Sequence, residues 1–279
     1  MILDNGQEQY EVVRDVFVGK DHVVSVCKYL QSVSVEYKVI WLVKNRVLAK
    51  KIIGVFSKTV FFREKEKSIF TYQDAVCFVL PYEEERPLMN FYLATVRMGV
   101  CSGQQIWQQL LVKCMSSELP KPILYLILRQ RQIKISQDGN IYFQYELDVT
   151  ELNPAVTEAE CTMECAKIIR ELMDLEHVST QAAVLIDRKL KRKGYIEFID
   201  LYKDIKIMIH QEAEIKKTSF REKIESRKDN IFRLLLVMGI ILLVIVIVIA
   251  VLQWKFQGDS AFRIFHYSVD QIGTESLLQ

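Results

Sequence analysis

One stretch near the end of the sequence constrains the chain more than any other. Residues 234–252 are nineteen consecutive apolar residues, from Leu234 to Leu252, with no charge, no proline and a single glycine, Gly239. As a helix rising about 1.5 Å per residue, the stretch measures about 28 Å, close to the roughly 30 Å hydrocarbon core of a bilayer. A buried helix of a soluble protein is the alternative, but such helices rarely lack polar residues on every face for so long. The stretch therefore predicts a transmembrane helix.

The charges that flank this stretch predict its orientation. Residues 216–233 hold seven Lys or Arg against three Asp or Glu, whereas the tail holds only Lys255 and Arg263. Basic residues close to a span stay on the cytoplasmic side. We therefore expect a single pass through the cell membrane, with the N-terminal region cytoplasmic and the tail outside. The topology-determining residues are Lys216, Lys217, Arg221, Lys223, Arg227, Lys228 and Arg233, and the predicted interfacial aromatics are Trp254 and Phe256.

The rest of the chain is long enough for a sizeable core before the membrane. Five regions are predicted: a β-rich region at 1–82, a helical region at 83–205, a basic juxtamembrane helix at 206–233, the span at 234–252 and a short tail at 253–279. The first residues have neither a basic nor an apolar signal-peptide region, so the span is expected to act as the insertion signal. A net charge of +2 gives no electrostatic case for nucleic acid.

The six cysteines all precede the predicted span, on the reducing side of the membrane. Most lie in apolar patterns, so they are expected to be buried thiols and not disulfides. Cys161 and Cys165 are one helical turn apart, but no second Cys or His pair lies near them. The sequence contains no Walker loop, GxSxG, GxGxxG or HExxH motif, and we predict no catalytic residue, metal or cofactor.

The hydrophobic pattern predicts an α+β fold. Three β-rich runs come first, then a helix, then further short strand segments, and from about residue 83 the spacing becomes mainly helical. Residues 123–128 are apolar and follow two prolines, and their pattern alone assigns no element. The expected strands are 10–17, 23–30, 37–43, 60–62, 68–72, 75–80, 132–135 and 141–145, and the expected helices are 45–56, 86–97, 102–115, 157–175, 178–193 and 195–214, the last continuing into the span.

This order of elements resembles a shortened, two-lobe protein kinase domain over roughly residues 10–205. Residues 68–93 (SIFTYQDAVCFVLPYEEERPLMNFYL) look like the kinase strand pair that leads into the hinge between lobes. Residues 133–147 (IKISQDGNIYFQYEL) are similar to the hairpin after the kinase catalytic loop, with Asp138 and Gly139 in its turn. An unrelated α+β domain with the same strand order is the alternative.

The catalytic signatures that the resemblance implies are missing. Phosphoryl transfer needs a glycine-rich loop, a strand lysine, a catalytic aspartate and metal ligands. The first hairpin has only Gly19, and the third strand has lysines only at its ends, Lys38 and Lys44, where they are expected to be solvated. Residues 126–131 (LILRQR) contain no aspartate or histidine, and Tyr145 occupies the expected position of the metal-binding aspartate, with Asp148 displaced from it. The resemblance therefore predicts a pseudokinase, which is not an enzyme.

Two functions from different classes follow. The first is a membrane-anchored scaffold or interaction protein that docks cytoplasmic or membrane partners, with self-association left open. Its layout resembles the pseudokinase-plus-span subunit of bacterial type VII secretion systems (the EssB/YukC family), although only 27 residues follow the span here, where that family has an extracellular helical domain. The second is a divergent kinase-like enzyme or nucleotide sensor at the membrane. A simple membrane tether is a weaker third, because Gly239 has no GxxxG partner.

Overall fold

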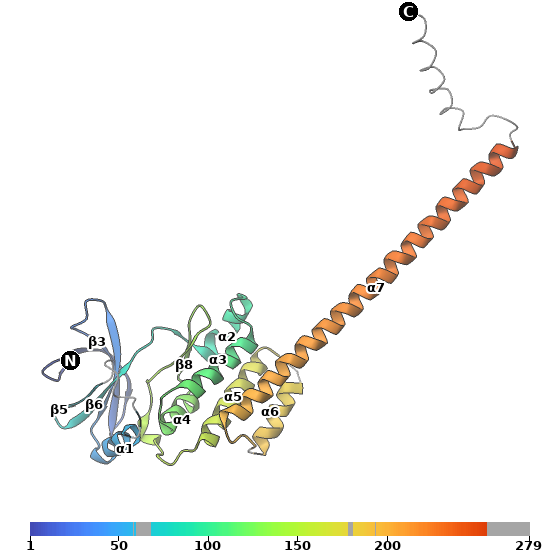
Figure 1. Cartoon of the computed structure of the whole chain (residues 1–279). Helices are drawn as coiled ribbons and strands as arrows, with labels where there is room; N and C mark the ends of the chain where they lie inside the picture. The colour runs from blue at the N-terminus through green and yellow to red at the C-terminus, as the bar shows by residue number, and fades with distance from the viewer. Residues whose placement is uncertain (58, 60–67, 178–180, 193, 256–279) are drawn as a thin grey trace, which may run out of the picture. The chain divides into compact units, whose positions relative to one another are not determined.

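The computed structural model describes residues 1–57, 59, 68–177, 181–192 and 194–255, apart from the side chains of residues 181–182, 208–231 and 253–254. The chain divides into two units, Met1–Gln211 and Glu212–Gln279. Among the described residues, the first unit contains all the strands and most of the helices, and the second begins inside α7 (Phe198–Lys255) (Figure 1). The predicted α+β class is confirmed: a β-rich N-terminal part, a helical middle and one apolar C-terminal helix.

A six-stranded antiparallel sheet forms the N-terminal part of the first unit. Its strand order is β1-β2-β3-β4-β6-β5, and one helix, α1, lies in the sequence between β4 and β5. Residues with β-branched or aromatic side chains dominate these strands, as expected for a pleated, half-buried surface. The strands are β1 (Ile2–Asp4), β2 (Gln9–Val18), β3 (His22–Tyr29), β4 (Glu36–Val43), β5 (Ser68–Tyr72) and β6 (Ala75–Pro81).

The middle strand β4 is apolar on both faces because both faces of the sheet are covered. Val39, Trp41 and Val43 belong to the large core shared with the helices. Ile40 and Leu42 alternate with them and belong to a smaller cluster on the opposite face. This alternation explains why the sequence of β4 is a nearly continuous apolar run.

Helix α1 (Arg46–Phe56) contributes to the large core. Its N-cap is Asn45, whose side-chain oxygen accepts hydrogen bonds from the backbone N–H groups of Val47 and Leu48. Ile52 and Phe56 are among its buried residues, and the Phe56 ring lies 6.3 Å from the ring of Trp41. The apolar spacing of the helix thus forms one wall of the core beside the sheet.

The helical middle follows a short linker after β6. Two of its helices begin with capping boxes, in which Ser102 pairs with Gln105 and Thr157 pairs with Glu160. A small antiparallel sheet with strand order β7-β8-β9 packs among these helices. The elements are β7 (Arg86–Pro87), α2 (Leu88–Arg97), α3 (Gly103–Ser116), α4 (Lys121–Arg129), β8 (Ile133–Ile135), β9 (Ile141–Phe143), the 3-10 helix η2 (Val149–Glu151), α5 (Glu158–Leu175) and α6 (Gln181–Lys191).

The last helix, α7, runs from Phe198 to Lys255. Its first turns complete the core of the first unit, since Phe198, Leu201 and Ile205 are buried there. One cluster of buried apolar side chains extends from Val24 in β3 to these residues of α7. The large sheet and the helical middle therefore share a continuous core.

The predicted elements agree with the observed ones to within a few residues wherever the structure describes them. The strand predicted at 60–62 lies outside the described residues. The pattern missed the short strands β1 and β7, and it left the apolar stretch 123–128 unassigned, which lies in α4. Five of the six cysteines are buried, as predicted, and Cys101 is partly exposed.

Candidate functional site

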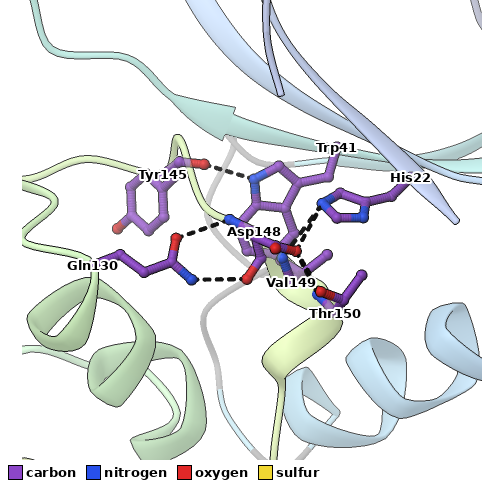
Figure 2. Close-up of polar contacts among 7 residues, drawn as sticks. All are labelled: His22, Trp41, Gln130, Tyr145, Asp148, Val149 and Thr150. Carbon is purple, nitrogen blue, oxygen red and sulfur yellow. Dashed lines mark hydrogen bonds and ion pairs between the residues drawn. The ribbon is translucent and has the colours of Figure 1, made fainter. Parts of the chain in front are cut away.

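The segment Tyr145–Thr150 lies where the resemblance places the metal-binding loop of a kinase, at the junction between the large sheet and the helical middle. It connects β9 to η2, and it receives hydrogen bonds from both sides (Figure 2). From the sheet, the indole N–H of Trp41 donates to the backbone carbonyl of Tyr145 at 2.6 Å. The nitrogen of the Trp41 ring is thus directed at the backbone of this segment.

From the helical side, Gln130 binds the same segment through both ends of its amide. Its Nε2 donates to the carbonyl of Asp148 at 2.8 Å, and its Oε1 accepts from the backbone N–H of Asp148 at 2.9 Å. Gln130 is the C-cap residue directly after α4. The two bonds reproduce those of a strand pair, so they fix the backbone of the segment at Asp148.

His22, the first residue of β3, contacts the next residue of the segment. The backbone N–H of Val149 donates to His22 Nε2 at 3.4 Å, and the Oδ1 atom of Asp148 lies 3.6 Å from the same nitrogen. The His22 side chain is fully buried and stacks on the ring of Phe17 at 4.7 Å. Burial lowers the pKa of His22, and the nearby carboxylate of Asp148 and carbonyl of Leu147 only partly oppose this effect. The neutral ring is the form that accepts the bond from Val149.

Asp148 itself is engaged locally. Its Oδ1 atom accepts hydrogen bonds from the backbone N–H of Thr150 at 2.9 Å and from the Thr150 hydroxyl at 2.6 Å. It is the N-cap of η2, a structural task typical of aspartate. Its carboxylate therefore serves the local fold of the segment.

Apolar and aromatic side chains fill the space around these bonds. Leu147 and Val149 are fully buried, and the ring of Trp41 lies 6.4 Å from that of Phe78. Trp41 occupies an inward-facing position in the middle of β4, within the large core. The junction is consequently a packed interior.

The linker after β6 is also bound by side chains of the protein. The backbone N–H of Glu83 donates to the fully buried Gln144 side chain at 3.3 Å, and Lys134 Nζ donates to the Glu83 carbonyl at 2.5 Å. Lys134 also lies 4.6 Å above the ring of Tyr82. Burial lowers the pKa of Lys134. Both backbone polar groups of Glu83 therefore have partners within the chain.

The lysines at the ends of β4 differ from the prediction in one respect. Lys44 is exposed, as expected, but Lys38 is buried and its Nζ atom lies 2.6 Å from the Glu36 carboxylate. The expectation that Lys38 is solvated was wrong. The physical reason is that Lys38 lies on the same strand face as Ile40 and Leu42, which belong to the smaller buried cluster, and its charge is paired with Glu36.

No set of three or more His, Cys, Asp or Glu side chains within the described part of the chain is placed to hold a metal ion. Cys161 donates to the carbonyl of Lys121 at 3.3 Å, and burial raises its pKa to about 12. This thiol is held in its protonated form, which is a poor nucleophile and metal ligand.

The predicted span coincides with the apolar end of α7. Among the described residues, one helical segment is long and apolar enough to cross a membrane, Phe232–Leu252, with a mean hydropathy of 3.7 and none of it buried. Leu234 and Leu252 are exposed, and a Cβ atom at Gly239 would meet no atom within 4 Å. The segment begins two residues earlier than predicted and includes Arg233, which is exposed.

The other predicted topology residues have no described side chains. Lys216, Lys217, Arg221, Lys223, Arg227, Lys228 and Trp254 lie in α7, with side chains outside the description, and Phe256 lies outside the described residues. The orientation therefore stays a prediction from sequence.

Comparison with known proteins assigns no family to the chain. No family model matches it, and no curated protein shows significant similarity to it.

Proposed function

We propose that this chain is a single-pass membrane protein that presents a catalytically inactive, kinase-like interaction module on the cytoplasmic side. The observation that supports membrane attachment is the segment Phe232–Leu252. It is uncharged apart from Arg233, and no part of the described protein buries it. In water, so many contiguous exposed apolar side chains would be strongly unfavourable, whereas in a bilayer each is favourably solvated.

The strand order supports the kinase-like character of the module. Strands β2, β3, β4, β6 and β5 are neighbours in that order, and α1 lies between β4 and β5 in the sequence. A linker, a helical part and the hairpin of β8 and β9 follow, as the resemblance to protein kinases implies. The order of the elements thus favours the likeness over an unrelated α+β domain.

The packed junction supports the absence of catalysis. Phosphoryl transfer depends on positioned phosphates, metal ions and a catalytic aspartate. Trp41 holds the inward position on β4, Gln130 caps the helix before the hairpin, and Tyr145 begins the segment that would carry the metal ligand. Trp41 and Gln130 bind this segment, and Tyr145 belongs to it. These groups therefore hold the two parts of the domain together.

A docking role follows from these two properties. A folded domain without catalytic groups, fixed to a membrane, acts through the proteins that it binds. The resemblance in layout to the secretion-system subunit makes an envelope or secretion complex the setting that we propose. The partners would then be other subunits of a membrane complex.

Two experiments test this proposal separately. For membrane attachment, the full chain should remain in the membrane pellet after alkaline carbonate washing and should leave it only with detergent. For docking, affinity purification of the tagged full chain in mild detergent should recover at least one stoichiometric partner. Recovery of the chain in the soluble fraction would overturn the first part, and recovery of the chain alone would overturn the second.

A nucleotide experiment tests the absence of catalysis. A ligand that binds only the folded state at a hundred times its Kd adds about 2.7 kcal/mol to stability, which a melting curve detects easily. We expect no change in the Tm of the detergent-solubilised chain with millimolar ATP and magnesium. A clear rise would favour the nucleotide-sensor function over the inactive module.

A further inference from the structure

A groove of about 560 Å³ lies in the helical middle, outside the junction described above. Gln105, Gln108 and Gln109 of α3 are among the residues that line it, and Tyr202 of α7 lines it too. The consecutive residues 140–142, which enter and form β9, are also lining residues. Since successive side chains of a strand point to opposite faces, a groove that touches three in a row runs along the edge of the strand.

The edge of β9 that borders this groove carries backbone groups that β8 does not use. Ser136 N–H donates to the Asn140 carbonyl at 3.0 Å, and Gln144 N–H donates to the Gln132 carbonyl at 2.9 Å. Antiparallel pairs alternate, so Tyr142 is the next residue bonded to β8, and the N–H and C=O groups of Ile141 point away from β8. Strand β9 is the last strand of its sheet, and no further strand of the described residues pairs with it on this side.

The side chains around the groove are polar but nearly uncharged. The terminal amide of Gln109 has one atom, Oε1, that is buried and without a hydrogen-bond partner among the described residues. Lys113 is the charged lining residue, and its ammonium lies 5.9 Å above the ring of Tyr142. Val112 adds an apolar contact and is 48% exposed. The lining therefore offers amides, one ammonium group and an apolar surface. We expect these groups to suit a ligand that has no basic residues.

We propose that this groove binds an extended peptide segment of a partner protein, which adds to β9 as a further strand. The outward backbone groups of β9 require N–H and C=O groups spaced as in a strand, which a helix cannot offer because it uses its own. The proposal rests on the docking function proposed above and names the chemistry of one partner segment.

A second copy of this chain fits the groove less well. Strand β9 has only three residues and lies beside α3, with which it is in contact. In a dimer, the α3 of the second copy would obstruct its β9 from reaching the groove. A flexible peptide segment has no such obstacle. The occupant that we propose is therefore a peptide.

The test uses the full chain in lipid nanodiscs and a displayed library of short random peptides as the probe. Enriched peptides are synthesised and their Kd is measured against the wild type, Val112→Trp and Val47→Trp. Val112→Trp fills the groove, and Val47→Trp is the matched control, since Val47 is also an exposed helical valine but does not line the groove. We expect Val112→Trp to weaken binding by about tenfold or more and Val47→Trp to leave it unchanged.

N-methylation of the bound peptide tests the mode of binding. Each backbone N–H of the best peptide is methylated in turn, and we expect binding to be lost at every second position, because alternate amides of an added strand face β9. Loss without this alternation would overturn strand addition. Equal binding to the wild type and Val112→Trp, or no enriched peptide at all, would overturn the groove as a peptide site.

Two further outcomes distinguish this proposal from a dimer interface and from the docking function proposed above. If sedimentation reveals a dimer that Val112→Trp dissociates, the occupant is a second copy and the peptide proposal is wrong. If a stoichiometric partner is recovered equally with the wild type and Val112→Trp, this groove is not its docking surface, while the docking function itself stands.

Discussion

At the scale of single residues, three side chains join the large sheet to the helical middle. Trp41, His22 and Gln130 come from a strand interior, a strand start and a helix end, and all three bind the backbone of residues 145–149. A buried backbone group without a partner costs about as much as a lost hydrogen bond, so these side chains make an irregular segment tolerable in the interior. Their role is to close the junction.

The buried imidazole of His22 should make stability depend on pH. Its pKa in the folded state is lowered below the ordinary value of 6.5. As the pH falls below 6.5, the unfolded chain binds a proton that the folded chain does not, so the free energy of unfolding falls, by at most about 1.4 kcal/mol per pH unit. We expect His22→Gln to lose this contribution. Denaturant titrations of the full chain in nanodiscs, between about pH 7.5 and 5.5, measure it.

The quantity compared is the slope of the free energy of unfolding against pH, in the wild type and in His22→Gln. A variant whose stability falls with decreasing pH as steeply as that of the wild type would contradict this role of His22.

Replacement of Gln130 should destabilise the junction without changing its volume much. Gln130→Met removes both hydrogen bonds to Asp148. The backbone N–H and carbonyl of Asp148 then lack these partners. We expect the free energy of unfolding to fall by about 1–3 kcal/mol. Gln137→Met, at an exposed position, is the matched control and should change stability by less than about 0.5 kcal/mol. Equal stability of the two variants in denaturant titrations would contradict the assignment.

At the scale of elements, two kinds of helix are present. Helix α5 has one buried face, with Ile168, Ile169 and Leu172 fully buried, and is capped by Thr157. The end of α7 from residue 232 to 252 is apolar all round apart from Arg233, and it is not buried. The first kind is stabilised by tertiary packing, whereas the second requires an apolar solvent. The hairpin of β8 and β9 depends instead on its turn, where Gly139 has a φ of +84°.

The apolar segment should tolerate one buried charge but not three. Its apolar residues each contribute about −0.3 to −0.6 kcal/mol to insertion, whereas one arginine near the centre costs about 2.5–3.5 kcal/mol. Val244→Arg should therefore remain in carbonate-washed membranes. Ile241→Arg, Val244→Arg and Val248→Arg combined should release the chain into the supernatant or leave it aggregated outside the bilayer.

The control places arginines on the folded unit. Val47→Arg and Val184→Arg lie at exposed positions and should leave the chain in the membrane. Retention of the triple variant in washed membranes would contradict the proposed span.

At the scale of the whole molecule, the proposed function depends on which side of the membrane the folded unit occupies. The free energy that sets orientation comes from basic residues within about 20 residues of the span. Seven such residues lie within 216–233 and two lie in the tail. The folded unit should therefore stay on the cytoplasmic side, where its docking surfaces meet cytoplasmic and membrane partners.

Removal of this charge asymmetry should disturb the orientation. With all seven basic residues of 216–233 changed to glutamine, and a reporter on the tail that is active only outside, we expect the active fraction to fall. Lys50→Gln, Lys191→Gln and Arg192→Gln together are the control, because these exposed residues lie far from the span in sequence. Unchanged reporter activity in the seven-residue variant would contradict the charge-based orientation.

The sequence by itself determined the features that depend on local periodicity. The apolar segment of α7, the alternation of β2 and β3 and the amphipathic spacing of α1, α3 and α5 each follow from neighbours within a few turns or strand residues. The capped start of α5 at Thr157 and the turn at Gly139 are equally local. For this reason the fold class and nearly all the long elements were predictable.

Only the tertiary structure decided which distant residues meet. His22 and Val149 are 127 positions apart, and Trp41 and Tyr145 are 104 apart, so no local pattern signals their contacts. The burial of Lys38 likewise depends on the residues that pack over its strand face. The helix at 121–129 depends on packing around an apolar run that follows two prolines. Long-range packing places these side chains, and it decides that residues 145–149 lie in a packed junction and that the edge of β9 is open beside α3.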